Sequence, residues 1–301
     1  MVFNIDGIIL ALISLGLLAV VIIASAIFKK WLNNYFFWLL ISILMLIYVI
    51  VMRFASGWEE YINAINSGKS FDDMDDIIIS RAWLLDLCPF VAFALPVTLI
   101  IDPTRKIASY IAPWAILGAV MVLFMQVPFQ DSNSSVNAVL NWEYIWSGID
   151  PNPIYFSMHL LSFLMGALVM MNVPKYKSFD CLWVAFFIVI YFFYVSLVMA
   201  FTGCEWNVTG LSINDWMYGE YSMVDVILGL GYPGSMLVGY LAFILGIVII
   251  LIINNFVINK IPFCKYSNKM FAYKKWITSY GFIYDFSNTN FYGTVNKNGK
   301  K

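Results

Sequence analysis

The sequence predicts an all-α fold: a polytopic membrane helix bundle with seven transmembrane helices, its N-terminus outside the cell and its C-terminus cytoplasmic. Three observations predict it: the composition, the length of the apolar stretches and the distribution of basic residues. Of the 301 residues, 62% are hydrophobic and 12% are charged, and the mean hydropathy is +0.82. A soluble domain carries about 25% charged residues, so this composition excludes a mainly water-facing protein.

Seven apolar stretches have the length that a membrane helix needs, which is about 20 residues. Helix is the expected form, because an open strand in lipid leaves its backbone groups unpaired. The first stretch is too long for a signal-peptide core and no basic residue precedes it, so it is expected to be a helix of the bundle. The stretches are 5–28, 35–53, 82–101, 107–127, 154–172, 181–202 and 233–257.

The basic residues alternate between connections. The connections after the first, third and fifth stretches and the segment after the seventh hold two, two, two and eight of the 17 Lys and Arg residues. Basic loops face the cytoplasm, which predicts the orientation and a multi-pass location in the plasma membrane. We expect a membrane domain over 1–257 and a basic, aromatic cytoplasmic tail over 258–301. The tail lysines either contact anionic lipid or only set the topology.

Three long connections are expected on the outer face, at 54–81, 128–153 and 203–232. They are either lids or simply exposed loops. The first of them contains a cluster of acidic residues: Asp72, Asp73, Asp75 and Asp76.

Two residues in the apolar stretches could carry chemistry. Cys88 is expected about six residues, and His159 about five residues, below the outer end of its helix, so the two share a layer roughly 7–10 Å deep. A thiol needs a base or a nearby cation to become a nucleophile, and a histidine at that depth can supply the base. The alternatives are that Cys88 is a small core residue, or that it forms a disulfide with Cys204.

Several neighbours have possible roles. Pro89 is expected to kink its helix and free the carbonyl of Leu85. Spacing places Arg81 on nearly the same helical face as Cys88, where it could hold a lipid phosphate. Asp86 is expected to orient His159 or to pair with Arg53 or Arg81.

Two further polar residues complete the candidate site. Gln126 could polarise an oxyanion, and Tyr155 or Ser162, at i−4 and i+3 from His159, could fix the imidazole tautomer. The four cysteines show no metal-type spacing, so no metal site is predicted, and no cofactor is implied.

Five segments resemble a known family. They read LLDLCPF, APWAILGAVMVLF, YFSMHLLSFLMGALVMMN, NDWMYGEY and DVILGLGYPGSML, in this order. They are similar to the YwaF-like integral membrane proteins of bacteria, which are related to the animal transmembrane protein 164. The resemblance covers roughly residues 80–255. The acidic 54–81 connection would mark a mycoplasma-type member.

The resemblance implies an acyltransferase that moves fatty acyl groups between phospholipids, with Cys88 as acyl acceptor and His159 as its partner. Asp86 departs from the pattern, because the bacterial motif usually has an acidic residue after the cysteine. The leading hypothesis is therefore a lipid acyltransferase or lipid ester hydrolase with membrane phospholipids, and no nucleic acid, as partners. The alternatives are a non-enzymatic transporter or lipid-binding protein with a polar outer cavity, and a protein whose outer loops bind a partner.

Overall fold

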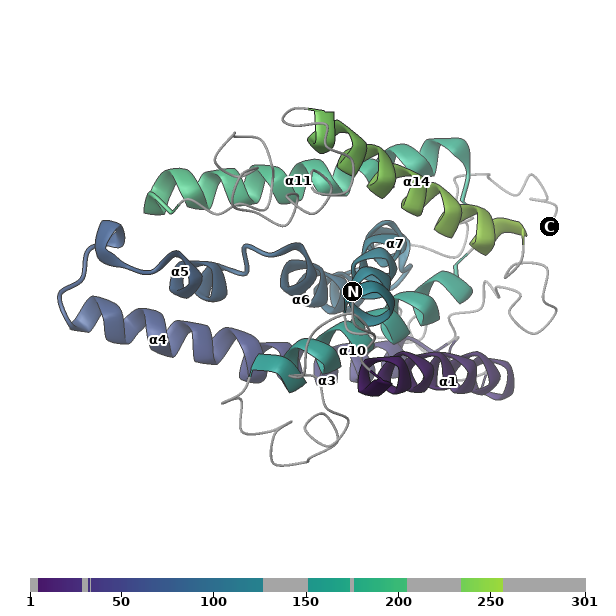
Figure 1. The fold of residues 1–301 in the computed structure, drawn as a ribbon. Helices are drawn as coiled ribbons and strands as arrows, with labels where there is room; N and C mark the ends of the chain where they lie inside the picture. The colour runs from purple at the N-terminus through teal and green to yellow at the C-terminus, as the bar shows by residue number, and fades with distance from the viewer. Residues whose placement is uncertain are drawn as a thin grey trace, which may run out of the picture.

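The computed structural model describes residues 5–28, 32, 34–126, 151–173, 176–204 and 234–256, and over these residues the fold is all-helical, with no strand (Figure 1). This confirms the all-α part of the predicted fold class. Most of the connections 128–153 and 203–232, and the tail 258–301, lie outside the described residues. The elements are α1 (Ile5–Ile27), α3 (Tyr35–Val49), the π-helical η1 (Ile50–Phe54), α4 (Ala55–Asn66), the 3₁₀ turn η2 (Phe71–Asp73), α5 (Asp76–Trp83), α6 (Leu87–Ile101), α7 (Lys106–Val120), the π-helical η3 (Met121–Gln126), α10 (Pro151–Met171), α11 (Ser178–Thr202) and α14 (Gly234–Phe256).

Within the described residues, five helical segments are long and apolar enough to cross a membrane. They are Ile8–Ser25, Tyr35–Asn66, Asp76–Ile101, Lys106–Phe124 and Phe179–Thr202. Two more apolar helices, over Phe156–Met171 and Tyr240–Phe256, are shorter in the part that is described. The count of seven spans and the orientation stay predictions.

The outer helices expose large apolar side chains. Leu12 of α1 is 62% exposed, Leu40 of α3 57%, Phe193 of α11 65% and Leu241 of α14 63%. Soluble monomers rarely expose contiguous apolar faces of this kind. Such faces suit lipid, in agreement with a membrane protein.

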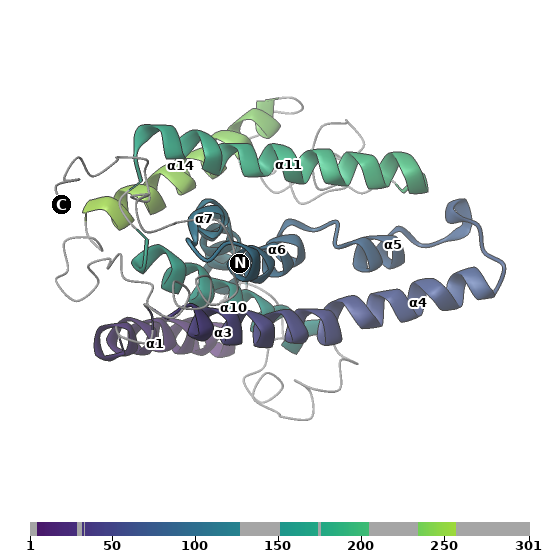
Figure 2. The ribbon, with the colours of Figure 1, turned by 180° about the vertical axis from the view of Figure 1, so that it is seen from behind.

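Helix α7 lies at the centre of the bundle, between α11 and α14 on one side and α3 and α10 on the other (Figures 1 and 2). It is the most buried of the five segments: 61% of its span is buried, against 22% for α1. Its buried alanines recur every three or four residues, at Ala108, Ala112, Ala115 and Ala119. Small residues let helix backbones approach closely in a membrane.

Gly166 of α10 packs on this alanine face. A Cβ built at Gly166 would lie 3.1 Å from the Ala112 carbonyl oxygen and 3.2 Å from the Ala115 Cβ. The close approach of α7 and α10 therefore depends on the missing side chain at Gly166.

The predicted loop at 54–81 is wrong, because most of it is helical. Helix α3 continues through η1 into α4, so one helical run extends from Tyr35 to Asn66. After the η2 turn, α5 returns alongside α4. Together they extend beyond the other helices, beside the C-terminal end of α11 (Figures 1 and 2).

Packing against protein explains this helical hairpin. One face of α4 is buried in a cluster that contains Tyr61 and Ala64 of α4 and Ile79 and Ala82 of α5, while Glu59 and Glu60 on the other face are exposed. The segment is amphipathic, so its sequence lacks the continuous apolar stretch from which the other helices were predicted.

A buried arginine secures the turn between α6 and α7. Arg105 adopts φ 62° and is 1% exposed. Its Nη1 donates to the Leu32 carbonyl at 3.2 Å, and its guanidinium lies 5.1 Å from the centroid of the Trp38 ring. The Trp38 indole donates to the same carbonyl at 2.7 Å. This charge, which the sequence counts as a loop residue, is therefore part of the core.

We predict that Gly57→Ala destabilises the protein, because a Cβ there would lie 2.8 Å from the backbone carbonyl carbon of Arg81 and neither backbone can move freely. Overpacking of this kind costs about 1–3 kcal/mol, which a lower thermal unfolding midpoint of the purified protein would reveal. Gly16→Ala in α1 is the matched control, since nothing lies within 4 Å of its built Cβ. Equal midpoints for the two variants would contradict the prediction.

Candidate functional site

The candidate site begins at a break between α5 and α6. Leu84 adopts φ 52°, and the Leu85 N–H donates to the Ser80 carbonyl at 3.0 Å, which closes α5. Asp86 then takes the N-cap position of α6, and the Phe90 N–H donates to the Asp86 carbonyl at 3.1 Å. The predicted continuous helix over 82–101 is therefore two helices.

This break makes Cys88 the second residue of α6 instead of a residue within a helix. The first N–H groups of a helix have no partner in the preceding turn, and the helix dipole is positive there. A sulfur or oxygen anion beside these N–H groups would be stabilised.

Pro89 does not kink a helix interior, contrary to the prediction. It is the third residue of α6, where a backbone N–H is not needed within the helix, so proline is tolerated. The Leu85 carbonyl instead accepts a hydrogen bond from the Tyr191 hydroxyl of α11, at 2.6 Å. The Tyr194 hydroxyl donates in the same way to the Trp83 carbonyl. Two tyrosines of α11 therefore satisfy the carbonyls on both sides of the break.

The Cys88 side chain is partly buried and packs against the main hydrophobic core. Its sulfur lies 3.1 Å from the position that a Cβ would take at Gly118 of α7. Gly118 therefore provides the space that the thiol occupies.

His159 is 1% exposed, inside α10. It is seven residues before Gly166, which is nearly two helical turns, so both lie on one face of α10. Gly166 packs on Ala112 and Ala115 of α7. Earlier residues of α10, such as Phe156, share a cluster with later residues of α7, such as Ala119. The two helices are therefore antiparallel, and His159 lies toward the Gly118 end of α7.

Cys88 and His159 thus approach the same end of α7 from two neighbouring helices. Two residues before His159, the Ser157 hydroxyl of α10 is hydrogen-bonded to the Tyr48 hydroxyl of α3. This bond connects α10 to α3, which also packs against α6. That the thiol and the imidazole pair directly stays a prediction.

Arg53 is a residue that the sequence indicated only as a possible partner of Asp86. Its Nη2 lies 3.5 Å from the Asp86 Oδ2, which selects Arg53 over Arg81 among the expected ion pairs. It belongs to η1, and π-helical segments are frequent at functional sites. A charged residue at the end of an apolar stretch was the signal that could have identified it.

Arg81 lies apart from the position expected for it. It lies in the last turn of α5, and its Nη1 lies 3.3 Å from the Glu60 Oε2 of α4. Since α5 and α6 are separate helices, Arg81 does not share a helical face with Cys88, and that prediction is wrong. Gln126 ends η3 and Tyr155 lies in α10, but their side chains lie outside the described residues.

The described cysteines are thiols. Among the described residues, Cys88, Cys181 and Cys204 form no disulfide with one another, so the alternative pairing of Cys88 with Cys204 is not present. The Cys204 sulfur instead lies 4.0 Å from the Asp76 carbonyl oxygen. In the described part of the chain, no group of three or more His, Cys, Asp or Glu side chains is arranged to hold a metal ion.

A family model described as "Family of unknown function (DUF5378)" matches residues 11–288. The chain belongs to this family. The DUF5378 match includes Cys88, His159 and every helix that surrounds them. The comparisons do not show a YwaF-like or transmembrane protein 164 family, so that resemblance stays a hypothesis.

Two mycoplasma proteins are similar to this DUF5378 chain. It is 33% identical over 192 residues to the "Uncharacterized protein MG135" of Mycoplasma genitalium, a match that covers 63% of this chain and 67% of the relative. It is 31% identical over 159 residues to the "Uncharacterized protein MG135 homolog" of Mycoplasma pneumoniae, covering 52% of this chain and 54% of the relative. The chain thus spans about half the length of the second relative. No solved structure matches.

In this DUF5378 chain, Tyr191→Phe is expected to lower the free energy of unfolding by about 1–3 kcal/mol, because it leaves the buried Leu85 carbonyl without its donor. Thermal unfolding of the purified protein measures the change. Tyr194→Phe is the comparison, and its effect should be smaller because that bond is only partly buried. An unchanged midpoint for Tyr191→Phe would show that another donor replaces the hydroxyl.

Proposed function

We propose that this protein is an integral membrane enzyme that transfers or hydrolyses the fatty acyl groups of phospholipids, with Cys88 as nucleophile and His159 as general base. The observation that carries the proposal is the position of the thiol at the start of α6, against Gly118, with a buried histidine directed toward the same end of α7. The YwaF-like resemblance supports the same two residues. We further propose seven spans with the N-terminus outside, which would put the site in the outer leaflet of the plasma membrane.

The proposed reaction has two steps. His159 takes the proton of the Cys88 thiol, and the thiolate attacks the ester carbonyl carbon of a phospholipid. A carbon–sulfur bond forms and the ester carbon–oxygen bond breaks, so the lysolipid oxygen leaves with the proton from His159. In the second step the hydroxyl of another lysolipid, or water, attacks the thioester, and the proton returns to the sulfur. An acyl group is transferred in the first case and a free fatty acid is released in the second.

The start of α6 suits this chemistry. Negative charge develops on the carbonyl oxygen in both steps, and preorganised donors stabilise such charge strongly in a site without water. The first N–H groups of α6 supply donors of this kind beside Cys88. We assign to Gln126 a further donor to that oxygen, and to Tyr155 the orientation of the imidazole.

Charged residues around α6 would position the lipid. The Arg53–Asp86 pair holds a cation at the start of α6, two residues before Cys88, and restrains the N-cap of that helix. Arg81 is about one-third exposed, so it can exchange Glu60 for the phosphate of a lipid headgroup. Surface ion pairs of this kind contribute little stability, so such an exchange costs little.

The same two ion pairs favour a second function, a non-enzymatic transporter or lipid-binding protein in which charged side chains line a polar cavity. Charged groups at membrane depth usually face an interior or a cavity. In that protein, Asp86→Asn would abolish function and Cys88→Ala would leave it unchanged, whereas the enzyme requires the reverse order of severity.

The enzyme proposal predicts an acyl-thioester on Cys88. Purified protein incubated with a phospholipid that carries a labelled acyl chain should retain the label, and neutral hydroxylamine should release it. Cys88→Ala should lose the label, while Cys181→Ala, which removes an exposed free thiol, should keep it. His159→Gln should slow acylation by about 100-fold or more, the usual contribution of a general base. Equal labelling of Cys88→Ala and wild type would refute the proposal.

Gly118→Ala should slow acylation without unfolding the protein. The added methyl group would lie 3.1 Å from the sulfur, which forces the thiol to move by a few tenths of an ångström. A misplacement of about 1 Å costs about 100-fold in rate, so this smaller displacement should cost less than that. The rate of acyl-thioester formation measures the effect, and the thermal midpoint controls for folding. A wild-type rate in the folded variant would show that the position of Cys88 is not critical.

A further inference from the structure

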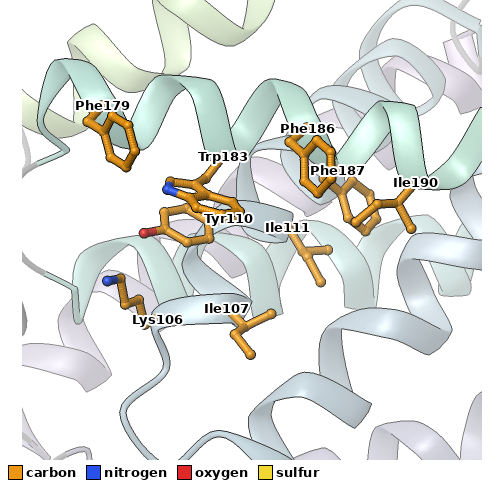
Figure 3. Close-up of a pocket in the computed structure, with 9 residues that line it drawn as sticks. All are labelled: Lys106, Ile107, Tyr110, Ile111, Phe179, Trp183, Phe186, Phe187 and Ile190. Carbon is orange, nitrogen blue, oxygen red and sulfur yellow. The ribbon is translucent and has the colours of Figure 1, made fainter.

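A second candidate site lies at the other end of α7. A groove with a volume of about 440 Å³ separates the first half of α7 from α11, and Figure 3 shows the side chains that line it. This volume is in the range of ligand-binding pockets, about 300–1,000 Å³. Most of the lining is apolar or aromatic, from both helices: Ile107, Ile111, Phe179, Trp183, Phe186 and Ile190.

The walls of the groove are held in place by polar contacts between the two helices. The Trp114 indole of α7 donates to the Val184 carbonyl of α11 at 2.7 Å. One turn earlier, the Tyr110 ring stacks on Trp183 with the centroids 6.2 Å apart, and the Tyr110 hydroxyl donates to the Asp180 carboxylate at 3.1 Å. The groove is therefore formed before any ligand arrives.

One end of the groove is polar, and its exposed charge is positive. The Lys106 amine and the Tyr110 hydroxyl point toward this end, next to Phe179 (Figure 3), and Lys106 is exposed. Asp180 is buried and accepts hydrogen bonds from Tyr110 and from the Lys177 N–H.

The other nearby carboxylate is also occupied. Asp102 caps the start of α7, since its oxygens accept from the Thr104 N–H at 2.9 Å and from the Ile107 N–H at 2.8 Å. Both carboxylates thus accept from N–H groups at helix starts, where the positive end of the helix dipole offsets part of their charge. The exposed charged group that an anion at the end of the groove would meet is the Lys106 ammonium.

The length of the groove matches one leaflet of a bilayer. From Phe179 to Ile190 the rise along α11 is about 16 Å, and half of a hydrocarbon core about 30 Å thick is about 15 Å. Phe179 and Ile190 are 64% and 46% exposed, on a face that suits lipid. A ligand that fills this groove has a charged group at one end and a hydrocarbon chain about one leaflet long.

We propose that the groove between α7 and α11 binds one anionic phospholipid, with its phosphate at Lys106 and one acyl chain along the groove toward Ile190. The alternative occupant is a second copy of the chain. It would have to place an acidic side chain at Lys106 and a narrow apolar ridge along the remainder of the groove. A zwitterionic lipid would leave Lys106 less well neutralised. The site is separate from the proposed acyl-transfer site, because Lys106 and Gly118 are about 18 Å apart along α7.

A photoactivatable phosphatidylglycerol tests the proposal. The full-length protein is reconstituted in phosphatidylcholine vesicles that contain a small fraction of phosphatidylglycerol with a diazirine midway along one acyl chain, and the cross-linked residues are mapped by mass spectrometry. Cross-links should concentrate on residues 107–111 and 183–190. Lys106→Glu should lower the yield of cross-links about fivefold, the effect of one basic residue at a membrane surface. With the wild-type protein, a phosphatidylcholine probe should give a cross-linking yield lower than that of the phosphatidylglycerol probe by a similar factor.

Three variants complete the design. Lys69→Glu, which reverses an exposed charge beyond the end of α4, should leave the yield unchanged. Ile190→Trp narrows the groove at a side chain that is 46% exposed, and it should lower cross-linking without loss of folding. Cys88→Ala should label like wild type, so the two proposals fail separately. The proposal is wrong if labelling spreads evenly over the exposed faces of α1, α3 and α11, if the two lipid probes label equally, or if the groove is covered by a second copy.

Discussion

The close packing of helices around α7 is the constraint on which the rest of the structure depends. In lipid, apolar side chains gain nothing by leaving one hydrocarbon environment for another, so helix association depends on shape. Here the shape comes from the buried alanines of α7 and from Gly166 of α10, whose missing Cβ would lie 3.1 Å from a backbone carbonyl. The same helix receives the Cys88 sulfur at Gly118 and the indole bond to α11 at Trp114.

The region between α5 and α6 has the opposite character. Three residues, Leu84 to Asp86, interrupt the helices, and carbonyls at the break need partners that a continuous helix would supply. Tyr191 and Tyr194 of α11 supply donors to the carbonyls of Leu85 and Trp83. The break is possible because tyrosine hydroxyls of α11 satisfy the carbonyls beside it. As a result, Cys88 lies at the start of a helix instead of in its middle. Ordinary lipid-facing helices have no need of such a feature.

The parts of the fold that were predictable from sequence are those in which a helix is apolar on every face. The apolar stretches at 5–28, 107–127 and 181–202 correspond closely to α1, α7 with η3, and α11, because a membrane helix needs a continuous apolar surface both where it faces lipid, as α1 does, and where it packs among other helices, as α7 does. The hairpin of α4 and α5 was missed because only one face of each helix is apolar and packs on protein. The polar residues of the other face lower the mean hydropathy of the segment.

The site was predictable in its residue types and less so in its geometry. Cysteine and histidine at similar depths can be identified by counting along helices, but that count assumes an unbroken helix from Arg81 to Cys88. The helix is broken at Leu84, which adopts φ 52°, and leucine carries no sequence signal for a left-handed conformation. Arg105 is a related case: its position in a short basic connection indicated topology, whereas its contacts with Leu32 and Trp38 can be seen only in three dimensions.

The π-helical segment η1 has a consequence for how this region could change. A π-helical turn holds one more residue than an α-helical turn, so Ile50–Phe54 contains an extra residue without turning the helix that follows. If the same residues rewound as a regular α-helix, everything after them would rotate by about 100°. Arg53 would then leave Asp86, and Gly57 would leave the backbone of Arg81. The wide turn thus sets the rotational phase of the whole hairpin, and the two contacts are kept or lost together.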